Sequence, residues 1–262
     1  MSSSWVFDQT HYDALNTARG DTIQCLLPEL KQRLNLKTAL DLGCGLGYYA
    51  EILHGYGFEV LGIDGRSENV EEARRRYPHL NFQVADAQDP ALGRLGRFDL
   101  VFCFGLFYHL ENPFGVIRSI AELTSKLTLL EGIVYPSPEP AMVLIDENNG
   151  VDQGLNFMAF YPSEPCLVKM LRRSGFSHCY TPDRMPSHPE YHAGPNGFRR
   201  RTVLAASKAP LDSPLLTCWP EPSPEFSPWA MLPLYPVGGT VGRFYGVLDR
   251  LLYGKARQAN RH

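Results

Sequence analysis

The segment Ala39-Leu-Asp-Leu-Gly-Cys-Gly-Leu-Gly-Tyr48 decides how this chain folds. Apolar residues run into Asp41, and Gly43, Gly45 and Gly47 follow at alternate positions before a helix-like stretch. Glycines at the end of a strand allow a tight turn that brings bare backbone close to a ligand. The segment therefore predicts a strand, a ligand-binding turn and a helix in immediate succession.

Short apolar runs alternate with amphipathic, helix-like segments along most of the chain after this turn. Such alternation predicts an α/β fold, in which a parallel sheet is covered by helices on both faces. We expect strands at residues 38–42, 58–63, 81–85, 98–104, 127–135, 177–181 and 201–207, and helices at 47–55, 67–77, 113–124 and 163–175.

The 262 residues divide into three parts. Residues 1–35 predict an N-terminal helical cap, and residues 36–209 predict the α/β domain, with an ordered proline-rich excursion over 182–198. Residues 210–262 predict a proline-rich strap followed by an amphipathic basic helix over 240–258. For that helix, docking on its own domain competes with contact to a partner or to a membrane surface.

Composition excludes several classes of protein. Lys and Arg number 25 against 28 Asp and Glu, and the net charge of -3 excludes a strongly basic nucleic-acid binder, although not a local basic patch. The sequence has no apolar run of about 18 residues and no leader-like start, so we expect no transmembrane segment and a cytoplasmic protein.

Metal and disulfide chemistry are not expected. The six cysteines form no C-x-x-C pair, and their irregular spacing predicts reduced thiols. His188 and His192 have the spacing of metal ligands on a helix, but Pro189 opposes the regular helix that would align them. We therefore predict no metal site.

Acids at the ends of the next two strands indicate what the turn binds. Asp64 ends the second strand and is placed to accept hydrogen bonds from two ribose hydroxyls. Asp86 follows the third strand at the adenine end, where capping the next turn is its alternative role.

The glycine spacing is G-x-G-x-G rather than the dinucleotide pattern G-x-G-x-x-G, and Asp41 would repel a pyrophosphate. A ligand that carries an ammonium and a sulfonium suits that acid, which points to S-adenosylmethionine. An oxidoreductase on the same fold is the least favoured interpretation.

These motifs resemble those of the class I S-adenosylmethionine-dependent methyltransferases over about residues 35–207. The resemblance implies a Rossmann-like sheet of seven strands whose last strand is antiparallel. It places the cofactor on the turn and on the strand ends, at Asp41, Gly43, Cys44, Gly45, Gly47, Asp64, Gly65, Asp86, Ala87 and Phe104.

The N-terminal segment offers two further candidates for the cofactor site. Arg19 could supply the cation that a cofactor carboxylate needs, and Tyr12 could cover the sulfonium through a cation–π contact. Positions on a surface helix are the competing interpretation for both side chains.

The residues after the fourth strand, 105–112, should face the transferred methyl group. They contain neither Asn/Asp-Pro-Pro-Tyr nor Pro-Cys, which disfavours methylation of an exocyclic amine of a DNA base or of cytosine C5. His109 is a candidate general base, needed only if the acceptor holds its proton, and a backbone hydrogen bond is its alternative role. Residues 146–161 and 182–200 are expected to complete the acceptor side.

A closer resemblance is to the catalytic domain of the tRNA uridine carboxymethyltransferases. It rests on Phe104-Gly-Leu-Phe-Tyr-His-Leu-Glu-Asn-Pro113, Leu129-Leu-Glu131, Phe160-Tyr-Pro-Ser-Glu164 with Phe176, and Arg201-Thr-Val-Leu-Ala205.

In that family, residues at the positions of Tyr108 and Arg201 help to hold the carboxylate of carboxy-S-adenosylmethionine. Tyr161 joins Tyr108, His109 and Arg201 as a candidate substrate-binding residue. A packing role is the alternative for Tyr108, and a solvated charge is the alternative for Arg201. The family's basic N-terminal extension has no match in this sequence.

We therefore predict a methyltransferase that uses ordinary S-adenosylmethionine on a small-molecule or glycan-type acceptor, with Tyr108 and His109 as catalytic residues. The alternatives are methyl or carboxymethyl transfer to a tRNA uridine, and a non-catalytic scaffold that binds the cofactor.

Overall fold

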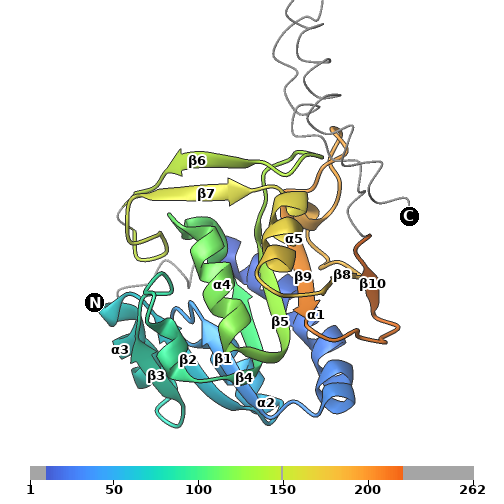
Figure 1. Cartoon of the computed structure of the whole chain (residues 1–262). Helices are drawn as coiled ribbons and strands as arrows, with labels where there is room; N and C mark the ends of the chain where they lie inside the picture. Colours follow the sequence, from blue (N-terminus) through green and yellow to red (C-terminus); the bar gives the residue numbers. More distant parts are fainter. Residues whose placement is uncertain (1–9, 149, 221–262) are drawn as a thin grey trace, which may run out of the picture. The chain divides into compact units, whose positions relative to one another are not determined.

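The computed structural model describes residues 10–148 and 150–220, with side chains from Asp13 onward (Figure 1). The chain divides into two compact units, Met1–Trp219 and Pro220–His262. The predicted helix over 240–258 lies outside the described residues. The side chain of Tyr12 does too.

The described residues form one large sheet. Its strands are β1 (Thr38–Leu42), β2 (Glu59–Asp64), β3 (Asn81–Val84), β4 (Phe98–Phe104), β5 (Thr124–Ile133), β8 (His178–Pro182), β9 (Arg201–Ser207) and β10 (Leu216–Cys218). Their order is β10-β8-β9-β5-β4-β1-β2-β3. Five neighbouring strands, β5, β4, β1, β2 and β3, are mutually parallel. Strand β9 lies between β5 and β8 and runs antiparallel to both. This confirms the predicted sheet with its last strand antiparallel.

Helices cover both faces of the sheet, as predicted. The hydrophobic core on one face includes side chains of α1 (Thr10–Leu34), α2 (Tyr48–Gly55) and α3 (Ser67–Arg76). The core on the other face includes side chains of α4 (Pro113–Leu123) and α5 (Glu164–Arg173), which lie in front of the sheet in Figure 1. Strand β4 serves both cores, because its side chains point alternately to the two faces.

Helix α1 continues through Pro28, and Ile23, Leu27 and Leu30 are almost fully buried. Tertiary packing of this apolar stripe outweighs the hydrogen bond that the proline removes. The N-terminal helical segment therefore forms part of the wall of the α/β fold.

Three strands were not among the predicted elements. Strand β10 pairs antiparallel with β8 as an eighth strand, beyond the predicted boundary at residue 209. Strands β6 (Met142–Asp146) and β7 (Met158–Pro162) form a separate two-stranded hairpin between β5 and α5. The segment that becomes β6 is apolar at four successive positions, so it lacks the alternation that marks a half-exposed strand.

The hairpin of β6 and β7 lies above α4 in Figure 1. A backbone hydrogen bond of 3.0 Å from Phe160 N to Leu110 O ties β7 to the segment that follows β4. Within the described ranges, no helix is long and apolar enough to cross a membrane.

Candidate cofactor and acceptor site

A cavity of about 530 Å³ opens at the carboxyl ends of the parallel strands. This is the edge where ligands bind in open α/β sheets. Its wall combines residues 42–46 of the glycine-rich turn, the ends of β2, β3 and β4, residues 151–155 and part of α1. The cavity brings together segments that lie more than a hundred residues apart in the sequence.

The glycine-rich turn is built around Ile63 at the end of β2. The backbone N–H groups of Gly43 and Cys44 donate to the carbonyl of Ile63 at 2.9 and 2.8 Å. Gly47 is the N-cap residue before α2 and lies in the left-handed region with φ of 86°, and a Cβ added there would lie 2.8 Å from Phe82 Cζ. A larger residue at position 47 would therefore combine backbone strain with a steric clash.

Asp64 lies at the centre of the predicted cofactor side. Its carboxylate accepts from Gly45 N at 3.0 Å, Arg66 N at 2.9 Å and Asn69 Nδ2 at 3.2 Å. Burial raises the pKa of this carboxyl despite those three donors. The protein thus fixes the orientation of Asp64 on the cavity wall, as a bidentate ribose acceptor requires.

Asp41 lies beneath the turn rather than on the cavity wall. Its side chain is 1% exposed, and it is hydrogen bonded by the backbone N–H of Ala50 in the first turn of α2. Its Oδ2 atom has no hydrogen-bond partner among the described residues. Burial, together with the nearby charge of Asp64, raises the pKa of Asp41 to about 8.

The remaining residues predicted at the adenosine end line the cavity, namely Gly65, Asp86, Ala87 and Phe104. Asp86 also accepts a 2.8 Å hydrogen bond from Gln88 N, so it caps the following turn as well. The ring of Phe104 stacks on that of Phe102 with the ring centroids 4.0 Å apart, and Phe104 is buried although it lines the cavity.

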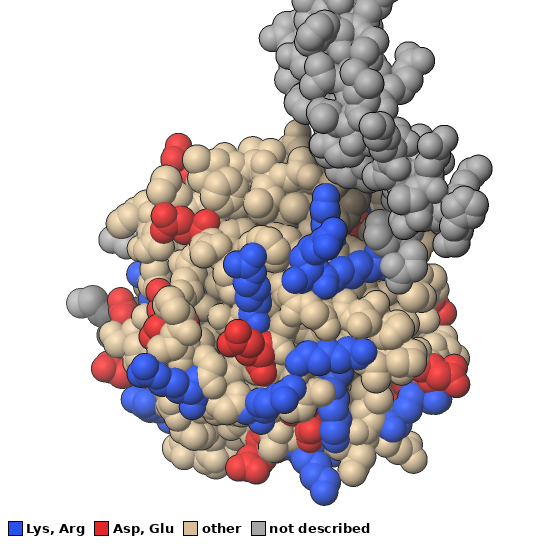
Figure 2. Space-filling view, in the orientation of Figure 1, with Lys and Arg blue, Asp and Glu red and all other residues tan. Residues whose placement is uncertain are grey.

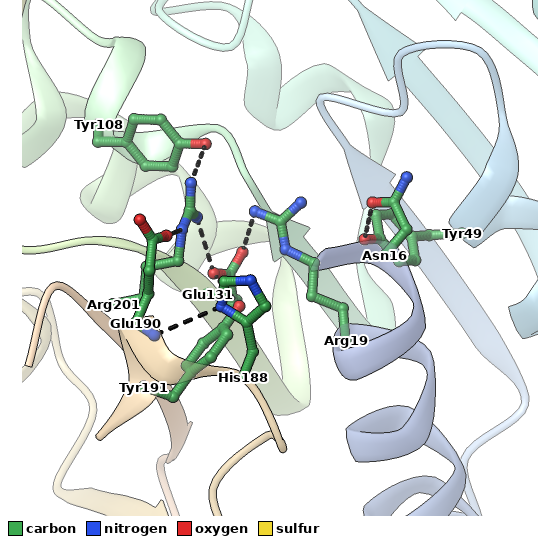
Figure 3. A network of polar contacts seen from close by, with 9 residues as sticks. All are labelled: Asn16, Arg19, Tyr49, Tyr108, Glu131, His188, Glu190, Tyr191 and Arg201. Carbon is green, nitrogen blue, oxygen red and sulfur yellow. Dashed lines mark hydrogen bonds and ion pairs between the residues drawn. The ribbon is translucent and has the colours of Figure 1, made fainter. Parts of the chain in front are cut away.

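Arg19 reaches the cavity from α1 and joins a buried polar network (Figure 3). Its Nη2 atom lies 2.6 Å from Oε2 of Glu131, which is fully buried in β5. Burial alone would raise the pKa of Glu131, but the charges of Arg19 and Arg201 hold it below its ordinary value. Arg19 is thus a fixed cation and not a mobile side chain on a surface helix.

Arg201 is the second cation of this network, which excludes the alternative interpretation of its side chain as a solvated charge. The residue is 6% exposed, and its guanidinium donates to Glu131 Oε1 at 3.0 Å and Glu190 Oε2 at 2.8 Å. Its Nη2 atom lies 3.4 Å from the hydroxyl of Tyr108. Tyr191 completes the network, because its hydroxyl donates to Glu131 at 2.6 Å.

Tyr108 contacts both the cavity and Arg201. It lines the cavity, whereas Arg201 and Tyr161 lie outside the wall. The ring of Tyr161 meets that of Tyr108 edge-on at 6.0 Å. Of the described residues 182–200, none lines the cavity; Glu190 and Tyr191 act instead from within the network.

His109 lies on the cavity wall at the end of the short 3₁₀ turn Phe107–His109. Its Nδ1 atom is 2.5 Å from Oε1 of Glu147, which follows β6 and is 3% exposed. The predicted candidate base therefore has an acidic partner that the sequence did not reveal.

Glu131 and Glu147 were given no role from the sequence. An acid inside the apolar run of β5 is a usable signal, because a carboxylate is rarely buried without a partner. Glu147 gives no comparable signal, since only the path of the β6–β7 hairpin brings it to His109.

Comparison with known proteins agrees with this geometry. A family model described as a methyltransferase domain matches residues 40–127. The tRNA U34 carboxymethyltransferase of Pseudomonas putida (strain GB-1) is 34% identical over 157 residues, covering 55% of this chain and 47% of the relative. The ubiquinone biosynthesis O-methyltransferase of Thiobacillus denitrificans is 33% identical over 91 residues, covering 33% and 39%. The chain spans about half or less of the length of these relatives.

Solved structures share the fold. The N-terminal domain of EvdMO1 with SAH bound has a TM-score of 0.58 and 20% identity, covering 72% of this chain and 80% of that one. Magnesium protoporphyrin IX methyltransferase from Synechocystis PCC 6803 with bound SAM has a TM-score of 0.54 and 21% identity, covering 77% and 85%.

The described part of this chain has the Rossmann-like fold of the class I S-adenosylmethionine-dependent methyltransferases. The domain match is to a methyltransferase domain, and the two solved neighbours have SAH or SAM bound. The acceptor is not identified by any of these likenesses.

Proposed function

We propose that this protein transfers a methyl group from S-adenosylmethionine to a small-molecule or glycan-type acceptor. The observation that carries the proposal is the single cavity that joins Asp64 and the glycine-rich turn to Tyr108 and His109. Its volume of about 530 Å³ falls within the range of small-molecule sites. We therefore assign the part of the wall around Asp64 to the cofactor and the part around Tyr108 and His109 to the acceptor.

The residues present fit the cofactor. Asp64 is oriented to accept from the ribose, Gly65, Asp86 and Ala87 line the adenosine end, and Arg19 offers a buried cation for a carboxylate. When bound, S-adenosylmethionine supplies a methyl group activated by a positive sulfur. The protein's own contribution is to align an acceptor beside Tyr108 and His109 and to exclude water there.

Calorimetry with S-adenosylhomocysteine tests the cofactor assignment. We expect binding by the full chain, and Asp64→Ala should weaken it about 10- to 100-fold through the loss of charge-assisted hydrogen bonds. Asp146→Ala, an exposed acid at the end of β6, is the matched control. Absence of binding by the folded wild-type protein at millimolar ligand would overturn the proposal.

Radiolabelled methyl transfer tests the acceptor class. The full chain is incubated with methyl-labelled S-adenosylmethionine and either a small-molecule extract or total tRNA. We expect label in the small-molecule fraction. Label confined to tRNA would reject the acceptor class, and cofactor binding without any transfer would favour the non-catalytic scaffold.

The second candidate is methyl or carboxymethyl transfer to a tRNA uridine. The contact between Tyr108 and Arg201 favours it, and so do the names of the carboxymethyltransferase relatives. Lys and Arg side chains also gather over α4 and α5 in Figure 2, where Arg118, Lys169 and Arg173 are exposed.

Two observations place this candidate second. Arg201 already has two carboxylate partners and does not line the cavity. The net charge of -3 also gives the chain no overall attraction for RNA. Mass spectrometry of the ligand that copurifies with the protein would decide between S-adenosylmethionine and its carboxylated form.

A further inference from the structure

The connection between β6 and β7, of which residues 147–148 and 150–157 are described, covers one side of the cavity. Residues 151–155 of this connection belong to the cavity wall. Leu155 lies so close to Gly65 that a Cβ added at Gly65 would be 2.6 Å from Leu155 Cδ1. The connection is therefore packed against the predicted cofactor side, and a larger residue at position 65 would displace the Leu155 side chain.

Hydrogen bonds fasten this connection to the residues around Asp64. Asn69 Nδ2 donates both to Asp64 Oδ1 and to the carbonyl of Val151, each at 3.2 Å. Arg66 Nη2 donates to the carbonyls of Gln153 at 3.3 Å and Gly154 at 3.0 Å. The backbone of residues 151–154 is thus held in a fixed position relative to Asp64.

Glu147 fastens the other end of the connection to His109. One carboxylate oxygen, Oε2, accepts from Gly154 N at 2.7 Å, and the other, Oε1, lies 2.5 Å from His109 Nδ1. The Glu147 side chain is 3% exposed and that of His109 is 14% exposed, so water competes little with this pairing. An ionised carboxylate can only accept, which places a proton on His109 Nδ1.

The other ring nitrogen of His109, Nε2, has no hydrogen-bond partner among the described residues. An imidazole with its proton fixed on Nδ1 presents a lone pair at Nε2. A nearby carboxylate that holds the ring in one tautomer is the arrangement that prepares a histidine to take a proton. His109 lies on the cavity wall next to Tyr108, where the acceptor is expected.

We propose that Glu147 is a positioning residue that orients His109 as a general base, and that the acceptor is therefore a hydroxyl or phenol. The proposal rests on the methyltransferase function proposed above. His109 Nε2 takes the proton as the O–H bond of the acceptor breaks. The freed electron pair on oxygen forms the bond to the methyl carbon, while the carbon–sulfur bond breaks and leaves its pair on sulfur.

A purely structural pair would hold the same tautomer, so the loss of kcat in the variants described below, and not the tautomer alone, distinguishes a base from a fastening of the hairpin. The groups that surround His109 must be considered in that comparison. Glu147 comes from the β6–β7 connection and Tyr108 precedes His109 in the same turn, with ring centroids 4.2 Å apart. Tyr161 of β7 and Arg201 of β9 both contact the ring of Tyr108. Glu147 is thus the one carboxylate bonded to the ring within the described residues.

The tautomer of His109 provides a test that needs no acceptor. Full-length protein labelled with ¹⁵N-histidine is saturated with S-adenosylhomocysteine, and long-range proton–nitrogen correlations are recorded. The signals of His109 are assigned by their loss in His109→Gln. We expect Nδ1 to be protonated and Nε2 unprotonated in the wild type, and Glu147→Ala to lose that preference.

Glu111→Ala is the matched control, because Glu111 is an exposed acid two residues from His109 that pairs with Asn156. It should leave the tautomer unchanged. A wild-type ring protonated on Nε2, or an unchanged tautomer in Glu147→Ala, would overturn the proposal. Affinity for S-adenosylhomocysteine is measured on every variant, so that failure of the cofactor site is recognised separately.

Turnover with the acceptor fraction identified by radiolabelling gives a second readout. His109→Gln should lower kcat about 10²- to 10⁴-fold, the usual contribution of a general base. Glu147→Ala should lower kcat by a smaller factor than His109→Gln, and this loss should exceed any loss of affinity for S-adenosylhomocysteine measured on the same variant, because Glu147 also holds Gly154 N. Equal activity of wild type and His109→Gln would reject the base.

Discussion

Replacing Asp41 by asparagine should stabilise the ligand-free protein at neutral pH. The folded state holds the pKa of this carboxyl at about 8, chiefly through burial, whereas the ordinary value is 3.8. Between these two pH values the unfolded chain binds fewer protons than the folded protein. The contribution of Asp41 to stability is therefore fully present below its unfolded pKa and is lost as the pH rises towards 8.

The size of the effect follows from the difference in pKa. A pH of 7 lies roughly three units above the ordinary pKa of the carboxyl in the unfolded chain. By that pH the wild-type protein has lost about 4 kcal/mol of folding stability. Asparagine can still accept from Ala50 N–H, and its amide nitrogen would replace an oxygen that already lacks a partner. Allowing for partial loss of polar contacts, a gain of about 3 kcal/mol remains, or roughly 10 °C in Tm.

Urea and thermal unfolding of wild type and Asp41→Asn, followed by circular dichroism between about pH 5 and pH 8, measure the effect. The stability difference should grow steadily with pH across this range. Asp146→Asn at an exposed position controls for the loss of a charge. Parallel pH profiles for wild type and Asp41→Asn, or a less stable variant at pH 7.5, would refute the reasoning.

Three further substitutions test the turn and the buried network by urea unfolding. Gly47→Ala should cost about 2–4 kcal/mol, because a left-handed backbone is combined with a clash against Phe82; a cost below about 0.5 kcal/mol would contradict this. Glu131→Gln should lower the free energy of unfolding by about 3–5 kcal/mol, because two buried guanidinium groups lose their shared anion. An unchanged urea midpoint would show that these guanidinium groups do not need a buried anion. Tyr191→Phe, which removes only the hydroxyl bonded to Glu131, should cost about 1 kcal/mol, and a loss as large as that of Glu131→Gln would mean that the ring's packing had been disturbed.

Most strands and helices were predictable from the sequence, because the apolar run of a strand and the amphipathic repeat of a helix both involve residues that are close together along the chain. The apolar runs predicted at 38–42, 98–104 and 201–207 coincide with β1, β4 and β9. The exceptions are informative. Strands β6 and β7 lack a polar alternation, and β10 has only three residues, so neither local pattern marks them.

The cofactor half of the site was also predictable, because its residues follow consecutive strands. Parallel strands bring their carboxyl ends to one edge, so Gly43, Asp64 and Asp86 meet on the same cavity wall. Asp41 was placed at the same turn, and the structure shows it beneath the wall, where burial governs its pKa.

The sequence by itself thus determined the α/β fold, the turn and the acids at the strand ends, since each depends on neighbours a few residues away. Only the tertiary structure decided the partners of the charged groups. Arg19, Glu131 and Arg201 come from three separate elements, and Glu147 reaches His109 across a hairpin. Such pairings depend on which surfaces pack together, and no spacing along the chain encodes them.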